Sequence, residues 1–325
     1  MALRGLAAAY AAVGDERAED TYRRAIALAP RDFALRFESV ESLWAAGRAD
    51  AADEEMARLL SEAGGARLRT RYAFELMRQQ RFADASREFA QSCRDARCDA
   101  QALEAWGSAL LETGRFGDAA ARYRDAIARV SNRVSARHNL GRVLLLAGNP
   151  AAARLELERA VQHEPGSPDV WLDLGRALEA LGQVDPAEAA YRRSLSFAPD
   201  LPRAHYALGA LLARRGHEEE ARREIALYQR AFEREQKERF QAGARRAELT
   251  LGWTDLAGGE AEKAAAQFGR HPDDPEALRG RASALARLGR HAEAVGALEH
   301  ALSISPADPR IRYALARERE NEKTP

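Results

Sequence analysis

Hydrophobic residues recur along this chain with the spacing of one face of an α-helix. Leu174, Leu178 and Leu181 stand at positions i, i+4 and i+7, which turns one side of a helix toward a core. Similar stretches follow one another along most of the chain, separated by short segments rich in Gly, Pro, Asn and Asp. The sequence gives no indication of β-strands. The pattern therefore predicts an all-α protein.

The helical stretches repeat with a fixed period. The glycines that end four of them are each 34 residues apart: Gly114, Gly148, Gly182 and Gly216. An alanine follows each of these glycines by five residues, and a larger residue follows the alanine by four: Ala119 and Tyr123, Ala153 and Leu157, Ala187 and Tyr191, Ala221 and Ile225. A fixed period of this length predicts an array of similar units, each stacked on its neighbours.

Each unit is predicted to be a hairpin of two antiparallel helices. Gly182 ends a first helix, because glycine adopts the left-handed conformation of a helix C-terminus at little cost. Gly175 and Ala187 are small where the two helices approach most closely, and Tyr191 fills the space beside them. A larger side chain at position 175 would push the helices apart.

The second helices are predicted to begin at Asx-Pro pairs. Asn149-Pro150 and Asp185-Pro186 each offer a side chain that can cap a helix N-terminus, followed by a proline suited to the first helical position.

One unit carries a nearly complete signature of a known family. Its residues resemble the tetratricopeptide repeat: Trp171, Leu174, Gly175, Leu178, Gly182, Ala187, Tyr191 and Pro199. The resemblance extends over most of the chain, in about nine units. It implies a right-handed superhelical solenoid of antiparallel helix pairs, in which the first helices line a concave groove. The excess of Arg over Lys, together with the many Ala residues, indicates a bacterial origin.

The spacing of the units predicts two blocks. Residues 1–230 would form repeats one to seven, and residues 217–249 an extended helix and bend that joins the blocks. Residues 245–325 would form repeats eight and nine with a C-terminal capping helix. The interval from Gly216 to Gly259 exceeds the period by nine residues, which predicts a long second helix over about His217–Gln241.

The charge composition disfavours a nucleic-acid partner. Lys and Arg total 50, as do Asp and Glu, so the formal net charge is zero, whereas nucleic-acid-binding domains usually carry a basic excess. No segment approaches the roughly 18 to 20 apolar residues that a membrane span needs.

Motifs of catalysis are also missing from the sequence. It contains no GxxxxGK[ST], GxGxxG, HExxH or GxSxG motif, and its seven histidines show no metal-ligand spacing. We therefore predict a protein that is not an enzyme and that needs no cofactor or metal.

The two cysteines leave the cellular compartment open. Cys93 and Cys98 lie five residues apart near a predicted helix end. A disulfide between them would indicate an oxidising compartment, such as the periplasm or cell envelope, whereas two free thiols would suit the cytoplasm.

Candidate binding residues lie on the predicted groove face of the first helices. In the third repeat this face carries Arg67, Arg71, Phe74 and Arg78, which could hold an acidic or carboxylate-bearing peptide through guanidinium forks and an aromatic anchor. The alternative is a solvated face balanced by the acidic second repeat. In the fourth to seventh repeats the same face carries Glu104, His138, Asn139, Arg142, Asp173, Arg176, Tyr206 and Arg214.

These observations favour a scaffold or adaptor that binds a partner peptide or protein segment in the groove, with an acidic segment as one candidate. Two other hypotheses stay open: a cell-envelope assembly or export component, and a substrate-recognition array of a larger enzyme. The helix over residues 217–241 carries Leu227, Phe232 and Phe240, which would either support self-association or pack on neighbouring repeats.

Overall fold

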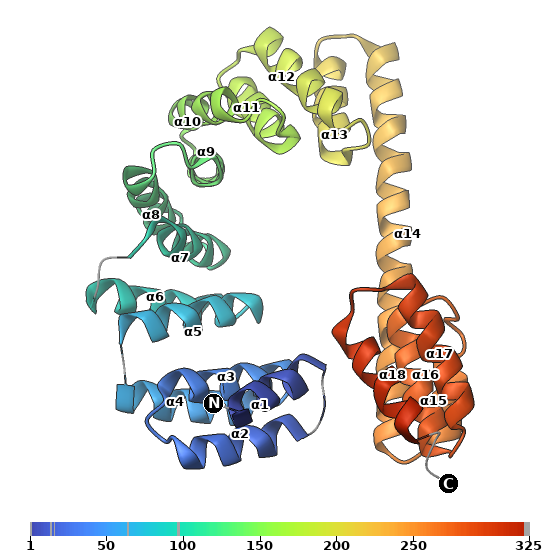
Figure 1. The fold of residues 1–325 in the computed structure, drawn as a ribbon. Helices are drawn as coiled ribbons and strands as arrows, with labels where there is room; N and C mark the ends of the chain where they lie inside the picture. Colours follow the sequence, from blue (N-terminus) through green and yellow to red (C-terminus); the bar gives the residue numbers. More distant parts are fainter. Residues whose placement is uncertain (1, 14, 16, 64, 96–97, 322–325) are drawn as a thin grey trace. The chain divides into compact units, whose positions relative to one another are not determined.

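The computed structural model describes residues 2–13, 15, 17–63, 65–95 and 98–321. These residues form eighteen α-helices and no strand (Figure 1). The predicted all-α class is confirmed. The chain divides into two compact units, one of residues 64–236 and one of residues 1–63 with 237–325.

The unit of residues 64–236 contains four complete helix pairs, followed by a first helix and the beginning of a long helix. The first helices are α5 (Ala66–Arg78), α7 (Ala100–Glu112), α9 (Val134–Leu146), α11 (Pro168–Ala180) and α13 (Pro202–Arg214). The second helices are α6 (Phe82–Asp95), α8 (Phe116–Arg129), α10 (Pro150–His163) and α12 (Val184–Phe197), and α14 (Glu218–Ala257) begins here.

The other unit contains the two ends of the chain. Its N-terminal helices are α1 (Ala2–Val13), α2 (Arg17–Leu28), α3 (Phe33–Ala45) and α4 (Ala49–Ala63). Its C-terminal helices are the remainder of α14, then α15 (Ala261–Phe268), α16 (Pro275–Arg287), α17 (His291–Ile304) and α18 (Pro309–Asn321). The rings of Tyr10 in α1 and Tyr313 in α18 pack edge to face, with centroids 6.4 Å apart.

The two helices of a pair meet where a glycine faces a bulky side chain. A Cβ added at Gly107 would lie 2.8 Å from the ring of Tyr123, and one added at Gly141 would lie 2.5 Å from Leu157. Both partner side chains are completely buried. Such distances are far inside van der Waals contact, so a larger residue in the first helix would separate the pair.

Of the two predicted N-terminal caps of second helices, the structure contains one. Asn149 caps α10 by accepting a hydrogen bond from the backbone N–H of Ala152 at 3.2 Å. The corresponding prediction for Asp185-Pro186 is wrong, because α12 already begins at Val184 and Asp185 lies in its first turn.

The turns within the pairs need a left-handed residue. Gly114, Gly148 and Gly182 have φ values of 74°, 71° and 72°. At the same turn between α5 and α6 the chain has Gln80, which adopts a φ of 60°. A residue with a Cβ pays roughly 1–2 kcal/mol for this conformation.

The helix α14 is longer than predicted. The sequence predicted a helix over about residues 217–241, whereas α14 runs for 40 residues, from Glu218 to Ala257. The first helix of the predicted eighth repeat is therefore the C-terminal part of α14.

Two substitutions at the left-handed position of the turn within a helix pair should change stability in opposite directions, one at position 80 and one at position 182. Gln80→Gly removes the left-handed penalty, and we expect a gain of roughly 0.5–1 kcal/mol once the greater freedom of glycine in the unfolded chain is subtracted. Gly182→Gln introduces the same penalty and should cost roughly 1 kcal/mol or more. Urea denaturation of both variants measures the changes, and a loss of stability in Gln80→Gly would contradict this account.

Candidate functional site

The candidate site is the surface formed by the first helices of residues 64–236, which we call the first-helix surface. In this unit α7 and α11 lie on one side of the ribbon, and their partners α8 and α12 lie on the other (Figure 1). Glycines 107, 141 and 175 turn one face of each first helix to its partner, which leaves the opposite face free for polar side chains.

The centre of the first-helix surface is the carboxylate of Asp173, which is only 7% exposed. His138 Nε2 of the preceding repeat lies 2.9 Å from one carboxylate oxygen, and Arg176 donates to the other at 3.1 Å. Arg142 Nε stands 4.0 Å from Asp173, and its Nη1 donates to Asn139 at 3.4 Å. The structure thus brings five of the predicted site residues into one cluster.

The electrostatics of this cluster favour an ionised Asp173. Burial by itself would raise the pKa of Asp173. The hydrogen bond with His138 and the charges of His138, Arg176 and Arg142 act the other way and lower the pKa below its usual value. The carboxylate therefore holds its cationic neighbours in place on the surface.

A second cluster lies on α11 and α13. Glu179 forms an ion pair with Arg214 and accepts a hydrogen bond from the hydroxyl of Tyr191 at 2.5 Å. Tyr206 lies on the same first helix as Arg214 and is 56% exposed. Glu179 was not among the predicted site residues, although its helical spacing from Asp173 and Arg176 in α11 could have identified it.

The other predicted residues do not join these clusters. Glu104 pairs with Arg133 at the N-terminus of the next first helix. In α5, Arg67 and Arg71 are exposed, and Arg78 pairs with Glu75 at 2.5 Å. Phe74 is half-buried and packs edge to face on Phe89, with centroids 5.3 Å apart. Phe74 therefore packs against its own helix pair, and its role as an aromatic anchor for a ligand stays a prediction.

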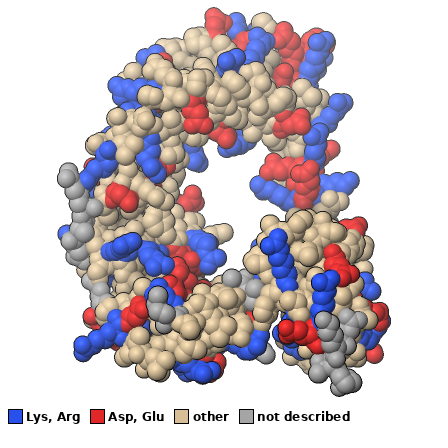
Figure 2. Space-filling model, in the orientation of Figure 1, with Lys and Arg blue, Asp and Glu red and all other residues tan. Residues whose placement is uncertain are grey.

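Charges of both signs are distributed over the surface. Figure 2 shows basic and acidic side chains interspersed over the face in view. Many of the arginines are already paired within the molecule, so the first-helix surface offers specific donor positions rather than a general positive field.

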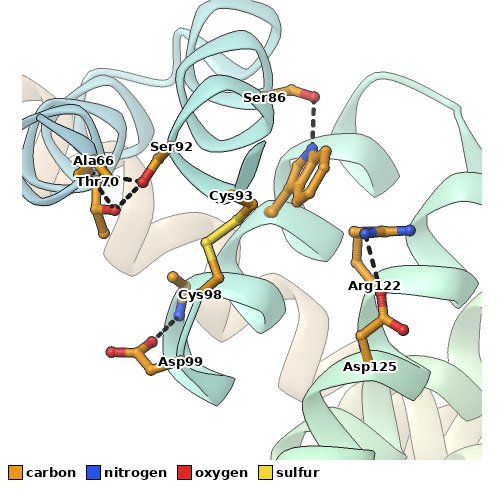
Figure 3. Close-up of a disulfide and its surroundings, with 11 residues drawn as sticks. Ala66, Thr70, Ser86, Ser92, Cys93, Cys98, Asp99, Arg122 and Asp125 are labelled. Carbon is orange, nitrogen blue, oxygen red and sulfur yellow. Dashed lines mark hydrogen bonds and ion pairs between the residues drawn. A yellow bond between two sulfur atoms is a disulfide. The ribbon is translucent and has the colours of Figure 1, made fainter. Parts of the chain in front are cut away.

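A disulfide lies at the junction of the third and fourth repeats (Figure 3). It joins Cys93 of α6 to Cys98, with the Cα atoms 5.1 Å apart. The next residue, Asp99, caps α7 by accepting from the N–H of Ala102 at 2.7 Å. The disulfide therefore links the C-terminal part of α6 to the residue that precedes the N-cap of α7.

The described residues contain neither a metal-binding cluster nor a membrane-spanning helix. In that part of the chain no group of His, Cys, Asp or Glu side chains is arranged to hold a metal ion. Among the same residues, no helix combines the length and apolarity required to cross a membrane.

Comparison with known families identifies the repeat. Three family models described as tetratricopeptide repeats match residues 104–169, 144–211 and 275–318. No curated protein matches the chain.

Solved structures share the fold. The C-terminal part of a TPR repeat-containing protein from Cytophaga hutchinsonii is 15% identical, with a TM-score of 0.50 over 86% of this chain and 99% of that one. A structure of MamA from Desulfovibrio magneticus RS-1, beginning at its residue 41, is 21% identical, with a TM-score of 0.47 over 53% of this chain and 96% of that one. The likeness to the Cytophaga hutchinsonii structure concerns the fold alone.

Breaking the disulfide should lower the free energy of unfolding by a measurable amount. A cross-link that closes so short a loop lowers the conformational entropy of the unfolded chain. This raises the free energy of unfolding by roughly 2 kcal/mol. We therefore expect a Cys93→Ser/Cys98→Ser variant to unfold at lower urea concentration than the oxidised protein. The fully reduced wild type should behave like the variant. Equal stability of all three forms would contradict the prediction, and thiol titration under denaturing conditions verifies the redox state.

Proposed function

We propose that this chain, which is a tetratricopeptide repeat protein, is a scaffold or adaptor that binds an acidic segment of a partner protein on its first-helix surface. The observation that carries the proposal is the cluster around Asp173. There a buried carboxylate orients Arg142 and Arg176, whose side chains stay 45% and 44% exposed.

The arginines of this cluster retain donors for a ligand. A guanidinium has five N–H donors, and in Arg176 the structure commits one of them to Asp173. A carboxylate of the partner can accept from the remaining donors in the bidentate geometry that arginine favours. Because Asp173 already restricts the side chain, less conformational entropy is lost when the partner binds.

Tyr206 supplies the apolar part of the recognition. Its exposed ring lies on α13 and packs against Tyr228 of α14, with centroids 5.3 Å apart. A rigid, exposed aromatic side chain buries a large area at low entropic cost. A segment with acidic residues and an apolar residue therefore suits this surface better than a purely apolar helix.

The role we infer is binding rather than catalysis. The polar side chains of the first-helix surface are engaged mainly in ion pairs with one another, including Arg133 with Glu104, Arg176 with Asp173 and Arg214 with Glu179. Such pairs position donors for recognition and do not form an arrangement of nucleophile and base. If the disulfide is formed in the cell, the same binding role would operate in an oxidising compartment, as expected of a cell-envelope assembly component.

Self-association is a second candidate function, and the seventh repeat favours it. In three preceding repeats the bulky residue of the second helix is completely buried, at Tyr123, Leu157 and Tyr191, whereas the equivalent Ile225 is only half-buried.

The same end of the unit exposes aromatic side chains. Tyr228 takes the place of the small residues Ala126 and Ala160, and its ring lies 5.7 Å from that of Phe232, which is 42% exposed. We propose that this aromatic face pairs with a second copy of the chain.

Reversing the two central charges should remove partner binding while leaving the fold intact. We expect Arg142→Glu/Arg176→Glu to retain the helical circular dichroism of the wild type and to lose, in affinity capture from a lysate of the source organism, a protein that the wild type retains. The matched control is Arg159→Glu/Arg193→Glu, which makes the same change of charge on the second helices α10 and α12.

Retention of the same protein by both double variants would overturn the first-helix surface as its binding site. If the second-helix control alone lost the protein, the site would lie on the opposite face.

Self-association should depend on Phe232. We expect the mass of the wild type in sedimentation equilibrium to rise with concentration, and Phe232→Ser to shift this rise to at least about tenfold higher concentration, because the buried aromatic area is lost. Phe197→Ser is the control, since Phe197 on α12 is exposed to a similar extent, 40%. A wild-type mass that stays at the monomer value at all concentrations would contradict self-association.

A further inference from the structure

The unit that holds the chain ends contains a cavity of about 360 Å³. It lies among the C-terminal part of α14, α16, the start of α17 and α18. Asp15, which lies in the sequence between α1 and α2, also lines the cavity. Its charged lining residues are Arg279, Arg287, Arg310, Arg317, Asp15 and Glu318, with Trp253 and His291 beside them. None of these arginines was among the predicted site residues.

Positive charge exceeds negative charge in this cavity. Four arginines face two carboxylates, which leaves an excess of two when His291 is neutral. Both carboxylates already have partners: Asp15 pairs with Arg17 at 2.8 Å, and Glu318 lies 3.0 Å from Nδ1 of His291 and 3.8 Å from Nε of Arg317. The acids of the lining are therefore only partly available to its arginines.

Two of the arginines are held in place by contacts at the edge of the cavity. Arg310 pairs with Asp308 at 3.0 Å, and Arg287 donates to the backbone carbonyl of Leu256 at 2.5 Å. Each contact fixes the side chain and leaves further N–H donors unused.

Arg279 is the exception among the four. In the part of the chain that the structure describes, it has no ion-pair partner, and its guanidinium lies over the ring of Trp253, 4.8 Å from the centroid. Burial lowers the pKa of Arg279, and the charge of Arg310 lowers it further. The charges of Glu276 and Asp308 raise the pKa by less, so the net direction is down. A partly buried cation beside a second cation is costly unless an anion neutralises it.

We propose that this cavity binds a phosphate group, held by Arg279 and Arg310 with Trp253 as one wall. The excess of two positive charges matches a dianion, and guanidinium groups donate to phosphate oxygens in pairs. The group can come from a phosphorylated side chain of a partner protein or from free phosphate. This site is separate from the first-helix surface around Asp173 and would remain if that surface bound nothing.

Calorimetry with inorganic phosphate tests the site in the whole chain. We expect the wild type to bind phosphate and both Arg279→Gln and Arg310→Gln to bind it at least about tenfold more weakly, because each loses charge-assisted hydrogen bonds. Arg319→Gln is the matched control: it removes the same charge from α18, and Arg319 pairs with Glu299 outside the cavity lining. Quenching or enhancement of tryptophan fluorescence, lost in Trp253→Phe, is the second readout.

Two peptides distinguish the sources of the phosphate. A short acidic peptide carrying one phosphoserine should bind more tightly than inorganic phosphate if a partner's side chain is the ligand, and no better if free phosphate is. The same peptide with Asp in place of phosphoserine should bind at least about tenfold more weakly than the phosphopeptide.

Three results would overturn the proposal. The first is the absence of heat and of fluorescence change with both phosphate and phosphopeptide. The second is binding that Arg279→Gln and Arg310→Gln leave unchanged. The third is equal affinity for the Asp and phosphoserine peptides, which would show that the cavity does not require a dianion.

Discussion

The close approach of the two helices in each pair is the constraint on which the rest of the structure depends. Gly107 and Gly141 bring the backbone of a first helix against Tyr123 and Leu157 of its partner, and no room remains for another side chain between them. This contact fixes the rotation of each first helix about its own axis. It thereby decides which side chains enter the core and which form the first-helix surface.

Stacking of successive pairs then places polar side chains of different repeats side by side. His138 in α9 meets Asp173 in α11, and Arg203 in α13 pairs with Asp169 in α11 at 2.6 Å. The partners in these contacts are separated by about one period in the sequence, so each is a contact between adjacent repeats. The resulting ion pairs add little to stability where they are exposed, but they determine which donors point outward. Recognition on this surface therefore depends on the regular stacking beneath it.

The two proposed binding sites use arginine in different surroundings. Around Asp173 a buried carboxylate partly neutralises the arginines, and the ligand would complete their hydrogen bonds. In the cavity beside Trp253 each lining acid has a partner other than Arg279, which stays without an ion-pair partner among the described residues. The first arrangement suits a monovalent carboxylate, and the second suits a group of higher charge.

The sequence by itself determined the helical hairpin and its period, because these depend on local properties. Gly182 adopts the left-handed conformation, Asn149 caps a helix, and small residues recur where helices cross. The sequence also placed His138, Arg142, Asp173 and Arg176 on a common face, since that face follows from helical spacing within each repeat.

Only the tertiary structure decided how these side chains are used. It showed that Phe74 packs on Phe89, that Asp173 is buried among its cationic neighbours, and that α14 continues to Ala257. It also brought Trp253, Arg279 and Arg310 around one cavity. These outcomes depend on contacts between residues far apart in the chain and on burial, which a periodic pattern does not specify.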